Sequence, residues 1–156
     1  MTKQEFEASG KKVLTLQMTR EYFKAILNGE QDVEHRVVYP KNASMYLHYE
    51  NEGKVYKNEG DIPDNESPIE FVTRDYDAIY FINGRKADAP RMLVEVKDAE
   101  LVFFKMLESG DLVPLEESDD DSEMFMYEEN GKWYHALQVW YKLGKVLCTE
   151  NLNNLK

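Results

Sequence analysis

Apolar and polar residues alternate over residues 12–18, which predicts a strand with one buried face. The next segment, 19–29, repeats its large apolar residues with the period of a helix, and they form one stripe: Tyr22, Phe23, Ile26 and Leu27. Thr19 is placed to accept a hydrogen bond from an early helical N–H, and Gly29 can adopt the left-handed conformation that ends helices. The pattern therefore predicts a strand followed by an amphipathic helix.

A second strand is predicted over residues 32–39, and it contains a pair of charged residues. A period of two puts Glu34 and Arg36 on one face with Val38, and it leaves the other face to Val33, His35 and Val37. Either the two charges line a binding cleft, or they form an ordinary ion pair worth roughly 0–1 kcal/mol on an exposed face. His35, on the more apolar face, is predicted to be a core or rim residue.

Further strands follow after a long polar stretch. β-rich runs are predicted at 76–84, which ends in a turn, and at 91–104, as one strand or two. Residues 124–147 are predicted as a hairpin that turns at Asn130-Gly131, a dipeptide that favours positive φ at both positions.

The final strand has two different faces. Tyr134 and Trp140 lie on one of them, where they could pack or could stack on a nucleobase. The other face is predicted to be core, and it consists of Trp133, His135, Leu137, Val139 and Tyr141.

About six strands and one clear helix near the N-terminus predict an α+β fold: a small, mixed, mostly antiparallel β-barrel with few peripheral helices. Residues 13–148 are predicted to form a single domain, with a flexible N-terminus at 1–12 and a C-terminal tail at 149–156. Within the domain, 40–68 is predicted to be an irregular insertion and 108–123 a solvated acidic loop.

Composition narrows the class of protein. The chain has a net charge of −11, and eight of its acidic residues lie in 108–123, so the remainder is near neutral. The negative charge therefore weakens the hypothesis of a nucleic-acid ligand but does not exclude it. The single cysteine, Cys148, permits no internal disulfide and suits a reducing compartment. No signal-peptide pattern and no apolar run of membrane-spanning length is present, which predicts a cytoplasmic protein with no membrane partner.

Three short stretches, in this order, resemble the ASCH domain family of the PUA-like superfamily. The first is "VLTLQMTREYFKAILNGEQDVEHR" at 13–36, the second "YDAIYFING" at 76–84 followed by "MLVEV", and the third "LGKVL" at 143–147. The first resembles the strand, helix and loop of the family, whose Gly, Lys, Glu and Arg correspond to Gly29, Gln31, Glu34 and Arg36. The resemblance covers nearly the whole chain.

The resemblance implies a PUA-like β-barrel with a cleft beside the helix–strand loop, and a role in binding RNA or modified nucleotides. The loop lysine of the family is replaced here by Gln31. In members that look like acetylcytidine amidohydrolases this lysine has a catalytic part, and an amide can act neither as an activated amine nor as a cationic stabiliser. Hydrolysis by that route is therefore in doubt.

Basic side chains elsewhere in the chain could complete such a cleft. Arg85 and Lys86 lie in the turn after 76–84, and Arg91 begins the next strand. If the fold brings this turn close to Arg36, the result is a cationic rim over a polar cleft; otherwise it is an ordinary charged turn. The candidate ligand-binding residues are Gln31, Glu34, Arg36, Arg85, Lys86, Arg91 and Trp140.

Three hypotheses follow. The leading one is a binding module for a nucleotide, a modified nucleoside or single-stranded RNA, in which Arg36 holds phosphate or base, Glu34 fixes polarity and Gln31 supplies an amide contact. The second is an amidohydrolase of an acylated nucleoside with Glu34 as general base. The third is an interaction protein that uses the acidic 108–123 loop.

No metal site or cofactor is predicted. The three histidines lack the short spacing of zinc ligands. Asp119, Asp121 and Glu123 resemble the start of a calcium loop, but the loop glycine and the distal glutamate are missing. The sequence does not predict the oligomeric state.

Overall fold

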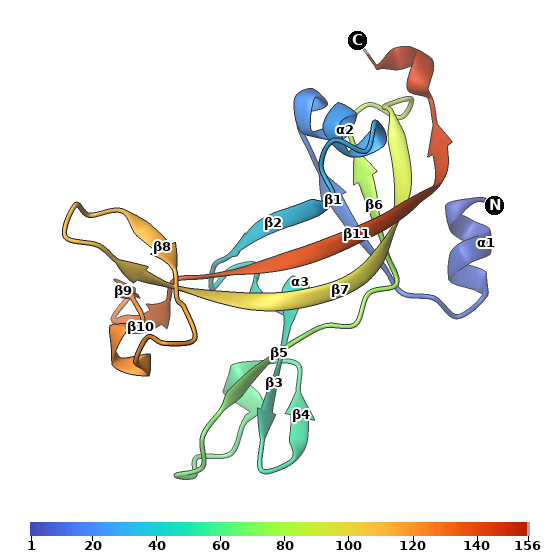
Figure 1. The fold of residues 1–156 in the computed structure, drawn as a ribbon. Helices are drawn as coiled ribbons and strands as arrows, with labels where there is room; N and C mark the ends of the chain where they lie inside the picture. Colours follow the sequence, from blue (N-terminus) through green and yellow to red (C-terminus); the bar gives the residue numbers. More distant parts are fainter. Residues whose placement is uncertain (156) are drawn as a thin grey trace. The chain divides into compact units, whose positions relative to one another are not determined.

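A computed structural model describes residues 1–155 (Figure 1). The chain forms a mixed α+β fold, rich in strands, with mostly antiparallel sheets, which confirms the predicted class at that level. It divides into two compact units, each assembled from separate segments. Unit 1 comprises Met1–Glu34, Asp75–Ala99 and Tyr141–Lys156, and unit 2 comprises His35–Arg74 and Glu100–Trp140. A single domain over 13–148 stays a prediction.

The elements of unit 1 alone are α1 (Lys3–Ala8), β1 (Val13–Gln17), α2 (Arg20–Leu27), β6 (Ala78–Ile82) and the 3₁₀ helix η3 (Leu152–Asn154). Three strands run from one unit into the other: β2 (Val33–Val38), β7 (Arg91–Met106) and β11 (Leu137–Glu150). The elements of unit 2 alone are α3 (Ala43–Tyr46), β3 (Leu47–Asn51), β4 (Lys54–Tyr56), η1 (Glu59–Asp61), β5 (Glu70–Thr73), β8 (Leu112–Pro114), η2 (Asp121–Glu123), β9 (Met126–Glu129) and β10 (Lys132–His135).

The core of unit 1 is built on β6. This strand pairs in parallel with β1 and antiparallel with β7, and all five of its side chains are buried. A strand covered on both faces needs a continuous apolar sequence, and "AIYFI" supplies one. The strand order is β1-β6-β7-β11-β2, with β8 paired to β7. Because β1 and β2 stand at the two ends of this order, closure into a barrel stays a prediction.

Helix α2 follows β1 as predicted, and Phe23 and Ile26 are its buried residues. Gly29 has φ +77° just after the helix, as expected for a left-handed helix end. The predicted cap differs in one respect. Thr19 is the N-cap residue, but within residues 1–155 its side chain makes no capping hydrogen bond.

The N-terminal segment 1–12, predicted to be flexible, contains helix α1. Thr2 caps it by accepting a hydrogen bond from the N–H of Glu5 at 3.1 Å. Phe6 packs on a buried cluster that includes Tyr80, and the Lys3 ammonium lies 5.1 Å from the centroid of the Tyr80 ring. One apolar anchor and one cation–π contact therefore hold this short helix.

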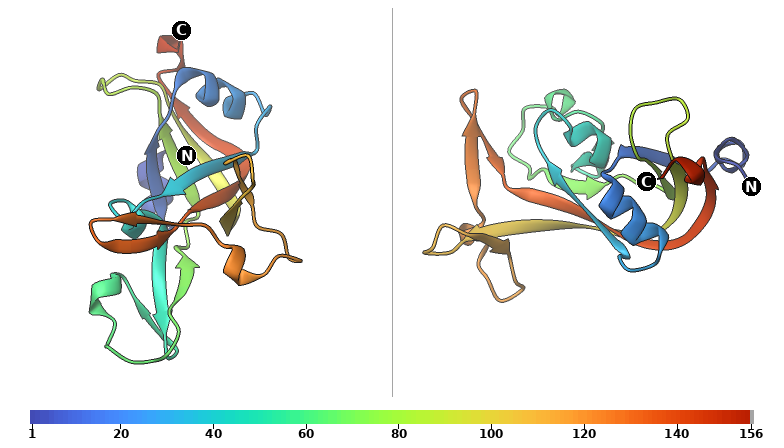
Figure 2. Two further views of the ribbon diagram at one scale, coloured as in Figure 1. Left: turned by 90° about the vertical axis from the view of Figure 1, so that its left-hand side faces the viewer. Right: turned by 90° about the horizontal axis from the view of Figure 1, so that it is seen from above.

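The segment 40–68, predicted to be irregular, contains α3, β3, β4 and η1, so that prediction is wrong for most of it. Strands β4, β3 and β5 form a small antiparallel sheet with β3 in the centre, and Figure 2 shows these strands side by side. The strands are short and separated by prolines and glycines, which conceal a period of two.

Asn51 at the end of β3 fixes the loop that follows β4. Its side chain is 3% exposed. Its amide donates to Asn65 Oδ1, Ser67 O and Pro68 O, each at 3.3 Å, and it accepts from Asn65 Nδ2 at 2.9 Å. A buried amide with its hydrogen bonds satisfied is an effective anchor, because breaking one leaves a polar group without compensation.

Strands β9 and β10 form the predicted hairpin. Asn130 and Gly131 have φ +54° and +80°, the conformation of a tight two-residue turn. The prediction that one face of the final strand is core is confirmed only in part. Leu137, Val139 and Tyr141 are buried, whereas Trp133 is 62% exposed, so its assignment to the core is wrong. The run is interrupted at Ala136, which separates β10 from β11 and breaks the alternation.

The acidic segment 108–123 contains β8 and η2 in addition to loop. Lys105 on β7 binds the Asp119 carboxylate at 2.8 and 2.9 Å, and this contact raises the pKa of Lys105 and lowers the pKa of Asp119. Asp120 and Glu123 form a reciprocal capping box around η2. The segment is therefore tied locally to β7 as well as solvated.

The predicted tail, 149–156, begins inside β11 and continues into η3; Lys156 lies outside the described residues. Asn151 and Asn154 donate side-chain hydrogen bonds to the carbonyl oxygens of Ala89 and Asp88, at 3.2 and 2.8 Å. In the part of the chain that the structure describes, no helix is long and apolar enough to cross a membrane.

Gly144 on β11 lies beneath the side chain of Glu95 on β7. A Cβ atom at Gly144 would overlap a Glu95 carboxylate oxygen, and it would lie 3.0 Å from Glu95 Cδ and 3.1 Å from Lys97 Cε. We expect Gly144→Ala to lower the free energy of unfolding by about 1 kcal/mol, near the lower end for overpacking because the crowded atoms belong to flexible side chains.

The double substitution Gly144→Ala with Glu95→Ala tests the cause of this loss. Removing the carboxylate should recover most of the stability lost by Gly144→Ala, which urea unfolding of the four proteins of the cycle would measure. Additive losses would show that the Glu95 side chain is not what the glycine accommodates.

Candidate functional site

The sequence-predicted residues divide between the two units: unit 1 contains Gln31, Glu34, Arg85, Lys86 and Arg91, and unit 2 contains Arg36 and Trp140. Gln31 follows α2, and its side-chain amide donates to the carbonyl oxygen of Val33 at 2.8 Å. This bond fixes the course of the loop into β2. It also gives the amide nitrogen a structural role in the position that the family resemblance assigns to a lysine.

Glu34 lies on the inward side of β2. It is 6% exposed, and along β2 the least exposed residues are Glu34 and Val38, with Arg36 intermediate. The predicted alternation is therefore present, and the more exposed side contains His35 and Val37. Glu34 is the last residue of unit 1 and Arg36 belongs to unit 2.

Arg85 and Lys86 are exposed in the connection between β6 and β7. Arg91 follows at the start of β7, and its guanidinium lies 5.9 Å from the centroid of the Tyr80 ring. The Tyr80 hydroxyl donates a hydrogen bond to the Glu150 carboxylate. Burial first, and then this bond, raise the pKa of Tyr80. Arg91 thus takes part in a local cluster within unit 1.

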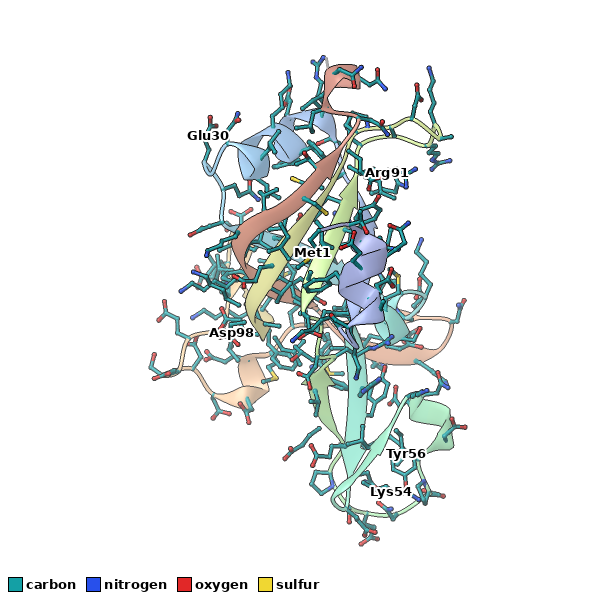
Figure 3. All side chains as sticks on the ribbon, turned by 90° about the vertical axis from the view of Figure 1, so that its right-hand side faces the viewer. Met1, Glu30, Lys54, Tyr56, Arg91 and Asp98 are labelled. Carbon is teal, nitrogen blue, oxygen red and sulfur yellow. The ribbon has the colours of Figure 1, made fainter. Side chains whose placement is uncertain are left out.

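Arg91 lies away from the loop after α2 within unit 1. Strand β11 lies between β7 and β2 in the sheet order. In Figure 3, Glu30, the neighbour of Gln31, and Arg91 are on opposite sides of unit 1. The cationic rim was predicted near Arg36, which belongs to unit 2, so the rim stays a prediction.

Trp140 is occupied by contacts within unit 2. Its ring centroid is 4.5 Å from that of His35, and its indole N–H donates to Gln138 Oε1 at 2.7 Å. The structure gives it the packing role that the sequence left open beside ligand stacking.

Unit 2 contains a pocket of about 650 Å³, within the size range of small-ligand sites. Its walls come from the end of β2 and the start of α3, from β3, from the loop around η1, from β5, and from the β9–β10 hairpin. The lining residues are Val38, Tyr39, Pro40, Ala43, Ser44, Leu47, Tyr49, Lys57, Asn58, Glu59, Gly60, Ile69, Phe71, Met126, Tyr127, Lys132, Trp133, Tyr134, His135 and Leu137.

The pocket is unusually aromatic, and part of its aromatic surface faces solvent. Trp133 is 62% exposed and Tyr39 is 47% exposed. Tyr127 and Tyr134 face each other across the hairpin with ring centroids 5.9 Å apart. Exposed aromatic side chains around a cavity are typical of surfaces that bind a partner or a ligand. A partner or ligand that covers these rings removes apolar surface from water, which favours binding.

His135 is held deeper in the pocket wall by two aromatic rings. Its ring meets Phe103 and Phe71 edge to face, with centroids 5.5 and 6.0 Å away. Burial lowers the pKa of His135, so the imidazole is neutral near pH 7. Within the described residues its Nδ1 is buried and has no hydrogen-bond partner.

Two tyrosines of the pocket have a raised pKa, partly because carboxylates lie near them. Burial raises the pKa of Tyr49, and the Glu59 carboxylate raises it further. Burial likewise raises the pKa of Tyr127, followed by the Glu129 carboxylate. The charged groups that act on these phenols are therefore anionic.

The net negative charge of the chain belongs to unit 2. Unit 2 contains 18 acidic and 7 basic residues, a net charge of −11, whereas unit 1 contains 12 of each. The acidic 108–123 segment accounts for eight of the acids in unit 2. A ligand of this pocket consequently approaches a unit of strongly negative net charge, although the charged residues of the lining itself are Lys57, Glu59 and Lys132.

Sequence reasoning identified Tyr134 as a possible stacking residue but missed Tyr39, Tyr49, Phe71 and Trp133. Two aromatic-rich stretches were the available signal: "YPKNASMYLHY" at 39–49 and "MFMYEENGKWYH" at 124–135. Their convergence depends on the β3–β5 sheet, which the sequence did not reveal. Residues 1–155 contain no group of three or more His, Cys, Asp or Glu side chains able to hold a metal ion.

Comparison with known proteins gives no relative: no protein-family model, no curated protein and no solved structure matches the chain.

The lowered pKa of His135 predicts a pH dependence of stability. The unfolded histidine takes up a proton near its ordinary pKa of 6.5, whereas the folded one remains neutral to lower pH. Stability should therefore be full above pH 6.5 and should fall as the pH is lowered from there to the folded pKa.

His135→Phe keeps an aromatic ring between Phe71 and Phe103 and removes the titration. We expect the urea midpoint of the wild type to fall further than that of the variant between about pH 7.5 and about pH 5.5, values that bracket an ordinary histidine pKa. Equal pH dependence of the two proteins would mean that His135 is not the group responsible.

Proposed function

We propose that this chain is a binding module whose unit 2 pocket takes the base of a nucleotide, a modified nucleoside or single-stranded RNA. The observation that carries the proposal is the solvent-exposed Trp133, which lines a cavity of about 650 Å³ together with four tyrosines. Stacking of a base on an aromatic side chain contributes roughly 1–3 kcal/mol, and it tolerates any base because every base has a π-face.

The walls also offer hydrogen-bonding groups suited to a base edge. Asn58 and Ser44 line the pocket, and the neutral His135 has one ring nitrogen that can accept and one that can donate. A small number of polar groups among aromatic walls is the usual composition of a pocket that orients a planar ligand.

The pocket wall at Ile69 is held in place before any ligand binds. The Asn51 amide bonds to the backbone of Ser67 and Pro68, just before Ile69 in the lining. A prearranged wall reduces the entropy lost on binding, since fewer side chains and loop residues must become ordered.

The proposal includes membership of the ASCH-like, PUA-like class and closure of its barrel. It is supported by the order β1, α2, loop, β2, by the left-handed Gly29 and by the inward-facing Glu34. Arg85 and Lys86 are exposed, and unit 1, to which they belong, has no net charge that would oppose a phosphate contact there.

Binding is favoured over hydrolysis. The amidohydrolase hypothesis needs a cationic or nucleophilic group at the loop after α2, and Gln31 uses its amide there to bond Val33. Glu34, the candidate general base, is buried on β2 and is not among the residues that line the unit 2 pocket.

Trp133→Ala tests the proposal with little risk to folding, because the side chain is mostly exposed. If wild-type protein binds adenosine, cytidine or a short unstructured RNA in a titration calorimeter, the variant should bind roughly 5- to 100-fold more weakly, as expected for one lost stacking contact.

Tyr22→Ala is the matched control, since Tyr22 is 59% exposed on α2 and lies outside the pocket. It should bind as the wild type does. Equal affinity of all three proteins would remove the pocket from the proposal, and absence of binding by the wild type to every one of these ligands would refute it.

A further inference from the structure

The pocket that we propose for a base has a definite electrostatic preference. Unit 2 carries a net charge of −11, and the pocket lies entirely within it. A phosphate group brought to this pocket would approach a strongly negative unit, whereas a cation would be drawn to it. The charge distribution alone therefore separates the candidate ligands of the proposed function.

The walls themselves favour a cation. The faces of tyrosine and tryptophan rings carry partial negative charge and attract cations held within about 6 Å of the ring centroid. Five such rings line this pocket: Tyr39, Tyr49, Tyr127, Trp133 and Tyr134. Glu59 adds a full negative charge to the lining and acts directly on the Tyr49 phenol.

Two lysines in the lining do not reverse this polarity. Lys57 and Lys132 are exposed, and Lys132 is paired in the hairpin register with Glu129. After burial, the Glu59 carboxylate raises the pKa of Tyr49, and the Glu129 carboxylate raises the pKa of Tyr127. Both lysines are thus exposed to water, whereas these two carboxylates lie close enough to the tyrosine rings to shift their pKa.

We propose that the pocket selects a flat ring that carries a positive charge, such as a base methylated on a ring nitrogen, over neutral and phosphorylated forms. This inference rests on the proposed function and identifies its ligand class. A charged aromatic ring satisfies both properties of the site, because it stacks on Trp133 and the tyrosines while its charge is stabilised by their faces and by Glu59.

Two isomers isolate the effect of charge. 1-Methyladenosine is protonated and cationic at neutral pH, whereas its isomer with the methyl group on the exocyclic amine is neutral and has the same non-hydrogen atoms. We expect the cationic isomer to bind roughly tenfold more tightly in calorimetric titration, from the added cation–π attraction. Adenosine 5′-monophosphate should bind more weakly than adenosine.

Glu59→Gln tests the local charge while keeping the shape of the side chain. It should reduce the preference for the cationic isomer by roughly threefold, the scale of one exposed charge pair. Glu66→Gln is the control, because it makes the same change in net charge, in the same unit, at an exposed residue outside the lining. Its preference should equal that of the wild type.

The outcomes distinguish this inference from the function on which it rests. Equal binding of the two isomers, or tighter binding of the monophosphate than of adenosine, would overturn the charge preference and leave the nucleoside-binding function intact. Loss of preference in Glu66→Gln as well as in Glu59→Gln would overturn the role of Glu59. Absence of binding by any nucleoside would overturn both proposals.

Discussion

The complete burial of β6 is the constraint on which unit 1 depends. All five of its residues are buried, so both faces must be covered and both edges must be paired. Parallel pairing with β1 satisfies one edge, and it requires a long connection through α2 and β2 before the chain returns. Antiparallel pairing with β7 satisfies the other edge and leads into the long strand that continues into unit 2.

Unit 2 combines a few stabilising contacts with exposed aromatic surface and a large net charge. Its small sheet is anchored by one buried amide, Asn51, and by aromatic contacts such as that between Tyr49 and Phe71, with centroids 5.7 Å apart. It leaves Trp133 and Tyr39 largely in water and concentrates the net charge of the chain. Exposed aromatic surface and self-repelling charge both cost stability, and a ligand-binding surface is the usual reason for retaining them.

The physical link between fold and proposed function is the geometry of the hairpin. The positive φ angles of Asn130 and Gly131 set the register in which Tyr127 opposes Tyr134 and Glu129 opposes Lys132. The same register turns Trp133 to solvent and brings His135 against Phe71 and Phe103. A one-residue slip would exchange these faces and turn His135 away from Phe71 and Phe103.

Local sequence determined the strand β1, the helix α2 with its glycine end, the alternation of β2, the buried run of β6 and the Asn130-Gly131 turn. Each depends on a period or a backbone preference contained within a few residues. Tertiary structure alone decided the β3–β5 sheet, the exposure of Trp133, the separation of Arg91 from Gln31 and the convergence of two aromatic stretches into one pocket. These depend on pairing between segments far apart in the chain, and the period of a single segment carries no information about its distant partner.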